Sequence, residues 1–456
     1  MDWTFGYWDL SSATKTLCPM KLRQAIHWEW KSLFSSPFLK SIIGVFILAS
    51  IYGMYKGRQV FLHQKEILAQ FHTESETAVA EALQLYQEGK LGPESRPWVN
   101  IRTPFYAYLV YLQPLVGLNP SPLMVFSVGQ AESFPYFKRV DIFSSPYDHD
   151  MVPEISNPER ISLGSLDFGL MWIYLLPLVL IACAMRIGSF EREVQLYKLI
   201  GTLGNEKKWK VQRFVALAIF FLLLLSLLLL IGWMMGEGQA NLVEIGTMGF
   251  WAMLYLLFWL VLLFFLSELQ LLQTGQALIF FLAWILFALI IPGAVQQAIA
   301  LQFPNTLSLE MIDAKRSGRT EIYEQEFRTT KAKILESHPE LDQSLPDSLR
   351  LERALEGIYM AAYREFLSEV TRKLDSVQSE KVSRARAWFP INPVSFFHHR
   401  LSHLARTDYD AYQQFKQEIT HKAEELNFQI FSQEWEGVVV DEKIFLQTQK
   451  VLNENQ

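Results

Sequence analysis

The sequence contains very little cysteine, and this scarcity limits the chemistry that thiols would support. Cys18 and Cys183 are the only two cysteines among 456 residues, the first ahead of an apolar run and the second inside another. Because the two positions differ in environment, we expect no disulfide between them. Two thiols are also too few for a cysteine-based zinc or redox framework.

Charged residues are scarce as well, at 19% of the chain, and acids exceed bases to give a net charge of −6. Proteins that bind nucleic acids concentrate Lys and Arg, because these residues neutralise phosphates. We therefore expect no nucleic-acid partner.

The common catalytic motifs are missing. No segment reads G-x-x-x-x-G-K-[ST], H-E-x-x-H or G-x-S-x-G, the patterns of phosphate-binding loops, zinc peptidases and esterases. The long apolar runs hold almost no ionisable side chains away from their ends, and an intramembrane enzyme needs such groups. We predict no catalytic residue and no cofactor, so ATP hydrolysis, if it drives this protein, occurs on a partner chain.

The sequence is instead rich in long apolar runs. A run of about 18 or more apolar residues is long enough as a helix to cross a hydrocarbon core roughly 30 Å thick. Five segments meet this test: Phe38 to Tyr55, Phe168 to Ile187, Phe214 to Met235, Met248 to Leu266 and Ala277 to Ala300. The sequence therefore predicts an all-α polytopic protein of the lipid bilayer with about five transmembrane helices. The first is expected to be an uncleaved anchor, since no cleavage pattern follows it.

Basic residues set the expected orientation. They gather at the end of the second run and between it and the third, at Arg186, Arg192, Lys198, Lys207, Lys208, Lys210 and Arg213, whereas the loop 236–247 has neither Lys nor Arg. Because loops rich in Lys and Arg stay inside, we expect segment 188–213 and the N-terminus to be cytoplasmic, in a plasma (inner) membrane.

This orientation divides the chain into five parts. Residues 1–37 form a cytoplasmic segment in which Met20 to Lys31 is either an amphipathic interfacial helix or a plain positive flank. Residues 38–55 form the first span, 56–167 and 301–456 are extracytoplasmic, and 168–300 hold spans two to five.

The two outer segments differ in character. The first begins with a helical stretch, Gln64 to Glu88, and then becomes rich in proline from Gly92 to Pro158, which predicts a compact, loop-rich domain with short strands at most. The second is helical over Thr320 to Arg386. It carries an apolar stripe at Leu351, Leu355, Ile358, Ala362, Phe366, Val370, Leu374 and Val377. The stripe predicts a packing seam, either with a second helix of the same segment or with a second subunit.

Two polar features lie near the outer side. His399 and His403 stand four residues apart, next to His398, but no third type of ligand is close in the sequence. We therefore interpret the three histidines as ordinary helix residues and predict no metal site. Asp167 precedes the second span and is expected to cap that helix.

The segment from Ser189 to Lys210 is the most informative one. Two acids, Glu191 and Glu193, begin a short helix with an apolar side, which glycines interrupt before a basic run. This pattern suits docking to a cytoplasmic partner, and the alternative is a plain basic loop.

The same segment resembles the permease subunits of the ABC-2 type export family, which carry S-x-E-R-E-x-G-T-L at this place. The matching residues are Ser189, Glu191, Arg192, Glu193, Leu196 and Leu199. A second set is similar to an uncharacterised subgroup with a large outer loop: Gly129, Gln130, Pro135, Tyr136, Val140, Asn157, Pro158, Gly164, Asp167 and Phe168. Members of this subgroup are often labelled as permeases for maturation of multicopper enzymes, by similarity to the nitrous-oxide reductase maturation permease. The likeness covers Met20 to Leu301 and, more faintly, Asn392 to Glu424.

The resemblance implies an assembly of two permease chains, identical or different, with cytoplasmic ATPase subunits. The residues implied to meet the ATPase are Glu191, Arg192, Glu193, Leu196 and Leu199, together with the helix from Met20 to Lys31. Gln130, Pro135, Tyr136 and Asp167 are possible motif residues on the outer side. Members usually have a sixth span, whereas nothing after Ala300 is apolar enough to cross, so that span is lost, truncated or supplied by another subunit.

Two functions follow from these features. The first is a permease subunit of an exporter, which contributes the pathway and the lever while a partner hydrolyses ATP. The alternative is a scaffold that does not transport and whose outer segments bind or assemble an extracytoplasmic protein. The two differ at Glu191 to Leu199, which a permease needs for its ATPase contact.

Overall fold

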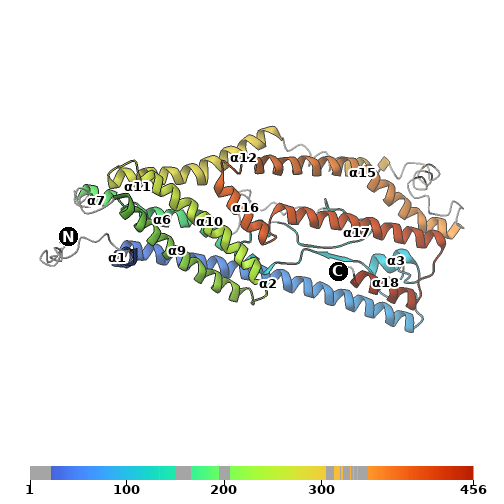
Figure 1. The fold of residues 1–456 in the computed structure, drawn as a ribbon. Coiled ribbons are helices and arrows are strands. Elements are labelled where there is room, and N and C mark those ends of the chain that lie inside the picture. Colours follow the sequence, from blue (N-terminus) through green and yellow to red (C-terminus); the bar gives the residue numbers. More distant parts are fainter. Residues whose placement is uncertain are drawn as a thin grey trace.

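The computed structural model describes residues 22–132, 134–148, 166–194, 206–303, 313–318 and 348–454, with five further residues between 320 and 336. The molecule is elongated, with a bundle of apolar helices at one end and a second, largely helical domain at the other (Figure 1). We call the second part the extramembrane domain.

Five helices among the described residues are long and apolar enough to cross a membrane. They are α2 (Pro37–Gln87), the helix Phe168–Glu193, α9 (Glu206–Met235), α10 (Leu242–Ser267) and the helix Gln273–Gln302. Each contains one of the predicted runs, so the all-α, multi-pass architecture is confirmed. The helices extend beyond the apolar runs because helical hydrogen bonding continues into the flanking polar residues.

Two of these helices have a π-helical turn within them. The second consists of α5 (Phe168–Leu170), the turn η4 (Met171–Leu175), α6 (Leu176–Ala184) and, after a glycine, α7 (Ser189–Glu193). The fifth consists of α11 (Gln273–Ile285), η5 (Leu286–Ile290) and α12 (Ile291–Gln302).

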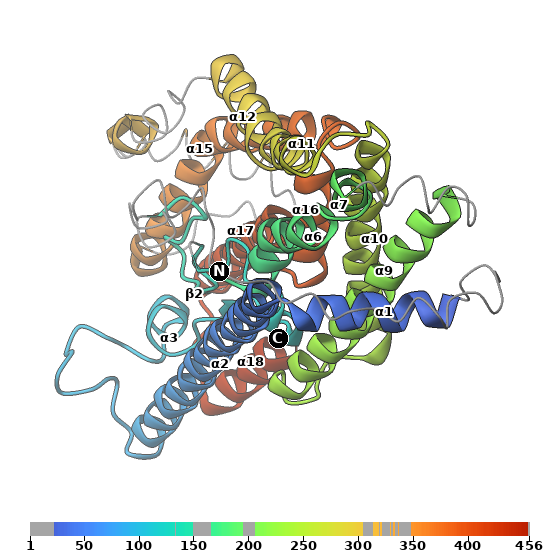
Figure 2. The same cartoon turned by 90° about the vertical axis from the view of Figure 1, so that its left-hand side faces the viewer.

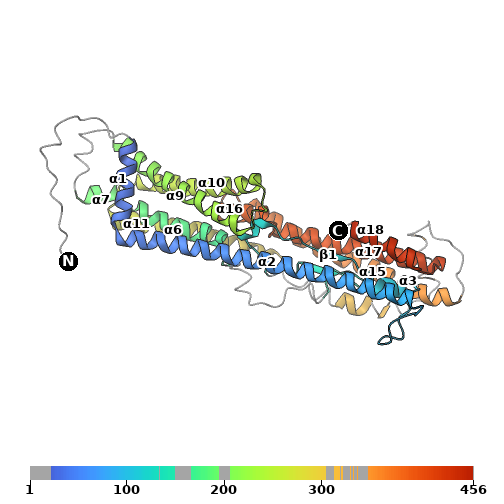
Figure 3. The same cartoon turned by 90° about the horizontal axis from the view of Figure 1, so that it is seen from below.

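Helix α2 joins the bundle to the extramembrane domain. It begins at Pro37, where the Ser36 side chain caps the helix, and continues for 51 residues. At 1.5 Å per residue it is roughly 75 Å long, more than twice the thickness of a hydrocarbon core. The predicted helix from Gln64 to Glu88 is therefore the continuation of the first span. Helix α1 (Leu22–Ser35) lies across the far end of the bundle, almost at right angles to α2 (Figure 3).

The second apolar helix is the centre of the bundle. Figure 2 shows α6 surrounded by α2, α9, α10 and α11. In the most apolar 18-residue stretch of the second helix 61% of the residues are buried, against 17% in that of the fifth helix. Its polar groups are bonded to α10: Trp172 donates to the carbonyl of Ala252 at 3.2 Å, and Tyr255 donates to the carbonyl of Ile173 at 2.5 Å. The central helix is thereby fixed in position as well as buried.

The extramembrane domain combines both outer segments. The first contributes α3 (Pro104–Val110), β1 (Leu115–Gly117), η2 (Pro122–Val125) and β2 (Phe137–Arg139). The second contributes α15 (Ser348–Ala387), α16 (Pro393–Leu404), α17 (Tyr409–Glu436) and α18 (Glu442–Glu454). Strands β1 and β2 pair antiparallel, with Leu115 opposite Arg139. The described residues between Gly92 and Asp148 thus have the predicted short elements.

One buried core unites the two segments. Val79 and Leu85 of α2 pack with Leu426 of α17 and Phe445 of α18, although more than 300 residues separate them. Helix α15 lies along α17 (Figure 1). Of the predicted stripe, Ala362 is buried, and Phe366 lies against Gly318 of the same outer segment, so Phe366 packs within that segment.

Candidate functional site

The predicted coupling segment begins with a sharp turn at the end of α6. Gly188 has a φ of +83°, in the left-handed region that favours glycine. Its N–H donates to Glu191 Oε2 at 2.9 Å, which fixes the first turn of α7. The Glu191 side chain consequently points back into the protein, and the residue is 5% exposed.

Glu191 belongs to a buried ion-pair cluster centred on Arg213 of α9. Arg213 Nη1 donates to Glu191 Oε1 at 2.5 Å, and Arg213 Nε donates to Glu29 Oε2 of α1 at 2.6 Å. The guanidinium carbon lies 4.8 Å from the ring centre of Trp28 and 5.0 Å from that of Trp209. Burial of three charges is tolerated because each has a partner. We call Glu29, Glu191 and Arg213 the Arg213 triad; it joins α1, α7 and α9.

The next two residues of α7 are bonded to α11. Arg192 donates to the Gln276 side chain at 3.2 Å, and that side chain donates in turn to the carbonyl of Ile187 at 3.0 Å. The backbone N–H of Gln273 donates to Glu193 at 2.8 Å. The short helix is thus connected to three other helices of the bundle.

The structure therefore assigns different surroundings to the predicted coupling residues. Glu191 is buried, Arg192 is half-buried and Glu193 is exposed, whereas Leu196 and Leu199 lie outside the described residues. Sequence reasoning missed Glu29. A signal for it was present, since Glu29 is the only acidic residue between Met20 and Lys40.

Asp167, at the other end of the central helix, has the predicted capping role and a second one. Its Oδ1 accepts from the N–H of Leu170 at 2.7 Å, which confirms the cap. Its Oδ2 accepts from the N–H groups of Val128 and Gly129 at 2.6 and 3.2 Å. Burial raises the pKa of this carboxyl, whereas the donated hydrogen bonds oppose that shift. Asp167 thereby holds loop 127–130 against the bundle.

The same loop contacts the turn between α16 and α17. Gly129 has a φ of +53°, and a β-carbon there would lie 2.8 Å from Thr407 Oγ1. The N–H of Gln130 donates to the carbonyl of Thr407 at 3.2 Å, while the Gln130 side chain is exposed. Pro135 and Tyr136 line a small cavity beside the same turn. All four predicted outer residues thus lie around the junction of bundle and extramembrane domain.

The three histidines of α16 face different surroundings. Burial lowers the pKa of His398, and the charge of Asp167 opposes that shift. His399 and His403 share a helix face and point at Asp408, with their Nδ1 atoms 3.8 and 2.9 Å from Asp408 Oδ2. The fold therefore supplies acids that the sequence interpretation had not found nearby.

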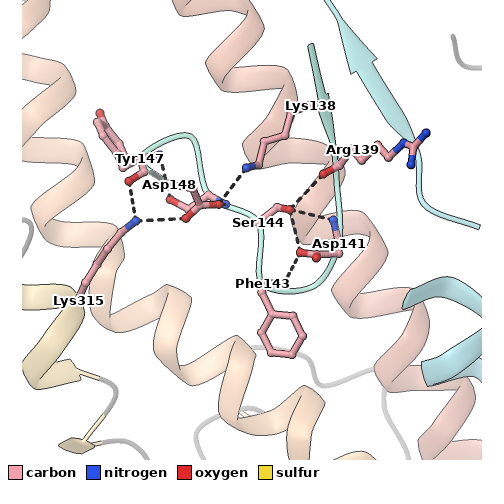
Figure 4. Close-up of polar contacts among 9 residues, drawn as sticks. Lys138, Arg139, Asp141, Phe143, Ser144, Tyr147, Asp148 and Lys315 are labelled. Atoms are coloured by element: carbon pink, nitrogen blue, oxygen red, sulfur yellow. Dashed lines mark hydrogen bonds and ion pairs between the residues drawn. The ribbon is translucent and has the colours of Figure 1, made fainter. Parts of the chain in front are cut away.

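A further polar cluster holds the loop after β2 (Figure 4). Lys138 and Lys315 both pair with Asp148, at 3.1 and 3.2 Å. Beside it, residues 142–147 together with α15 and α17 line a cavity of about 740 Å³. Asp375, on its wall, pairs with Lys416 at 3.0 Å. These charges are engaged with one another, and we assign the cluster a framework role.

The comparisons with known proteins identify one domain. A family model described as a domain of unknown function (DUF3526) matches residues 308–437, which include α15, α16 and α17 and end at Gly437, the C-cap of α17. No curated protein and no solved structure matches the chain. The protein is thus a multi-pass membrane protein with an uncharacterised DUF3526 domain between its fifth apolar helix and α18.

Proposed function

We propose that this chain is the membrane-spanning permease subunit of an ABC-2 type exporter, energised by a separate ATPase that docks on the segment after α6. The observation that carries the proposal is the bonding of α7. This short helix is tied to α1 and α9 through the Arg213 triad and to α11 through Gln276. A force applied to α7 would reach three other helices of the bundle without passing through a flexible loop.

In this mechanism the chain contributes the pathway and the lever, while covalent chemistry takes place on the ATPase. Closure of the ATPase pair shifts α7, and the bonded helices move with it between two packing arrangements. The proposal puts the α7 end of the bundle in the cytoplasm, and the exposed Lys207 and Lys208 at the start of α9 support this orientation, because basic residues favour the inner side. The weakly covered helix α11–α12 offers a surface for a second permease chain.

A pair of matched substitutions tests the ATPase contact. Val194 ends α7 and is 45% exposed, whereas Val439 is 63% exposed in the extramembrane domain. Both valines lie outside the membrane-spanning helices and outside the Arg213 triad, so neither Val194→Asp nor Val439→Asp disturbs that packing. Leu196→Asp and Leu199→Asp extend the test to the remaining predicted coupling residues.

The tagged chain would be purified in mild detergent, its partners identified by mass spectrometry and ATP turnover measured. We expect a nucleotide-binding subunit with vanadate-sensitive turnover, retained by Val439→Asp and depleted at least five-fold by Val194→Asp. Equal recovery in both variants would contradict docking at α7. Recovery of only proteins bound to the extramembrane domain, without an ATPase, would favour the scaffold function instead.

A further inference from the structure

The corner between α16 and α17 gathers four side chains with metal-binding atoms. His399 and His403 project from the last two turns of α16, and Asp408 and Asp410 stand at the start of α17. The ligand atoms of His399, Asp408 and Asp410 all lie within 4.8 Å of one another. His403 Nδ1 is 2.9 Å from Asp408 Oδ2 and 3.9 Å from Asp410 Oδ2. We propose that His399, His403, Asp408 and Asp410 bind one divalent metal ion of the zinc class.

The ligand types and spacings fit this class of ion. Imidazole nitrogen and carboxylate oxygen both bind zinc at about 2.0–2.2 Å, so neighbouring ligand atoms of a tetrahedral site are roughly 3.3 Å apart. Three histidine–carboxylate separations, 2.9, 3.8 and 3.9 Å, lie within about 0.6 Å of that value. The shortest is a hydrogen bond between His403 Nδ1 and Asp408 Oδ2, which the ion would replace. Rotation of the His403 side chain would add it to the three ligands that already lie together, His399, Asp408 and Asp410.

The corner is held rigidly by the surrounding structure. Asp408 Oδ1 accepts from the N–H of Ala411 at 3.3 Å, which leaves Oδ2 directed at the histidines. Arg406 has a φ of +55°, so the turn that brings the two helices together is tight. The ring of Phe389 lies 5.4 Å from that of His399 and limits its movement. Ligands positioned in advance lose little conformational freedom when they bind an ion.

The charge of the corner also favours a cation. The two carboxylates outnumber the nearby cation, Arg386, whose Nη2 lies 2.5 Å from Asp410 Oδ2. The Arg386 side chain is 35% exposed, so it can turn towards solvent when an ion takes its place. A carboxylate accepts several bonds through its two oxygens, so Asp410 can serve a metal once this contact opens. Arg386 thus competes with the ion for Asp410, so removal of the Arg386 charge should raise the affinity of the site for the ion.

The proposal does not depend on the transport function. Helix α16 of the extramembrane domain packs against α10 of the bundle, and α17 packs in the core of the extramembrane domain. A metal at the corner of α16 and α17 would hold the helix that contacts the bundle in a fixed position on its own domain.

The test is a Zn²⁺ titration of the full chain in detergent after treatment with a chelator, followed by calorimetry. Co²⁺ added to the same samples reports nitrogen and oxygen coordination through its absorption bands. We expect one tight site per chain, weakened at least ten-fold by His399→Ala and by His403→Ala. His421→Ala is the matched control, because His421 is exposed on α17 away from the corner, and it should bind like the unaltered chain.

Arg386→Gln separates a metal site from a purely structural ion-pair cluster. If Arg386 competes with the ion, this substitution raises the Zn²⁺ affinity several-fold. If the cluster is only structural, Arg386→Gln and His403→Ala lower the melting temperature and leave Zn²⁺ binding unchanged. That result, or equal binding by the unaltered chain and a His399→Ala/His403→Ala double variant, would overturn the proposal.

Discussion

Replacement of Arg213 by methionine should destabilise the bundle much more than the same replacement of Arg58, an arginine of α2 with a single hydrogen bond. The substitution leaves Glu29 and Glu191, which are 2% and 5% exposed, as buried acids without their cation. Removal of one partner from a buried ion pair costs about 3–5 kcal/mol, because an uncompensated charge stays in a poorly solvated site. Loss of the cation–π contacts that the Arg213 guanidinium makes with the rings of Trp28 and Trp209 adds to this cost.

The assay is reversible unfolding in mixed micelles, followed by tryptophan fluorescence as the fraction of denaturing detergent rises. Arg58→Met is the matched control, because Arg58 makes one hydrogen bond, to the carbonyl of Met235 at 3.1 Å. Loss of that bond should cost only about 0.5–1.5 kcal/mol.

A triple variant tests the same reasoning from the other side. Arg213→Met combined with Glu29→Met and Glu191→Gln removes all three charges, while the glutamine keeps an acceptor for the N–H of Gly188. A buried triad replaced as a whole is often tolerated, so the triple variant should be more stable than Arg213→Met alone. The account of the triad fails if Arg213→Met costs no more than Arg58→Met, or if the triple variant is the least stable of the set.

Three further substitutions test how the helices are joined. Asp167→Asn should cost about 2–3 kcal/mol of unfolding free energy in the same assay. The Asp167 carboxylate accepts hydrogen bonds from three backbone N–H groups, whereas the asparagine amide is neutral and one of its two polar atoms is a donor. Gly129→Ala should cost about 1–3 kcal/mol, since φ is +53° and the added carbon meets the α16–α17 turn; a neutral result would contradict that packing. Gly53→Ala places a carbon 2.5 Å from the backbone nitrogen of Phe168 and should lower the melting temperature, whereas Gly44→Ala, on the same helix with nothing within 4 Å, should not. Equal melting temperatures for those two variants would exclude the close approach of α2 to the central helix.

The sequence by itself determined the membrane architecture. Transfer into a bilayer depends on the apolar character of about 20 consecutive residues, which is a local property that can be evaluated along the chain. The five helices, the loop-rich character of the first outer segment and the cap at Asp167 were therefore predictable. The continuity of α2 was not, because nothing in a residue pattern shows that two adjacent helical stretches share one axis.

Only the tertiary structure decided which polar side chains meet. Glu29 and Arg213 are 184 residues apart, and their pairing depends on where α1 crosses α9. The histidines of α16 show the same limit, because the sequence marked three of them and the fold turned two of them, His399 and His403, towards Asp408. A polar site forms only where side chains from different elements point at the same place. The spacing of residues along the chain determines the directions of side chains only within a single helix.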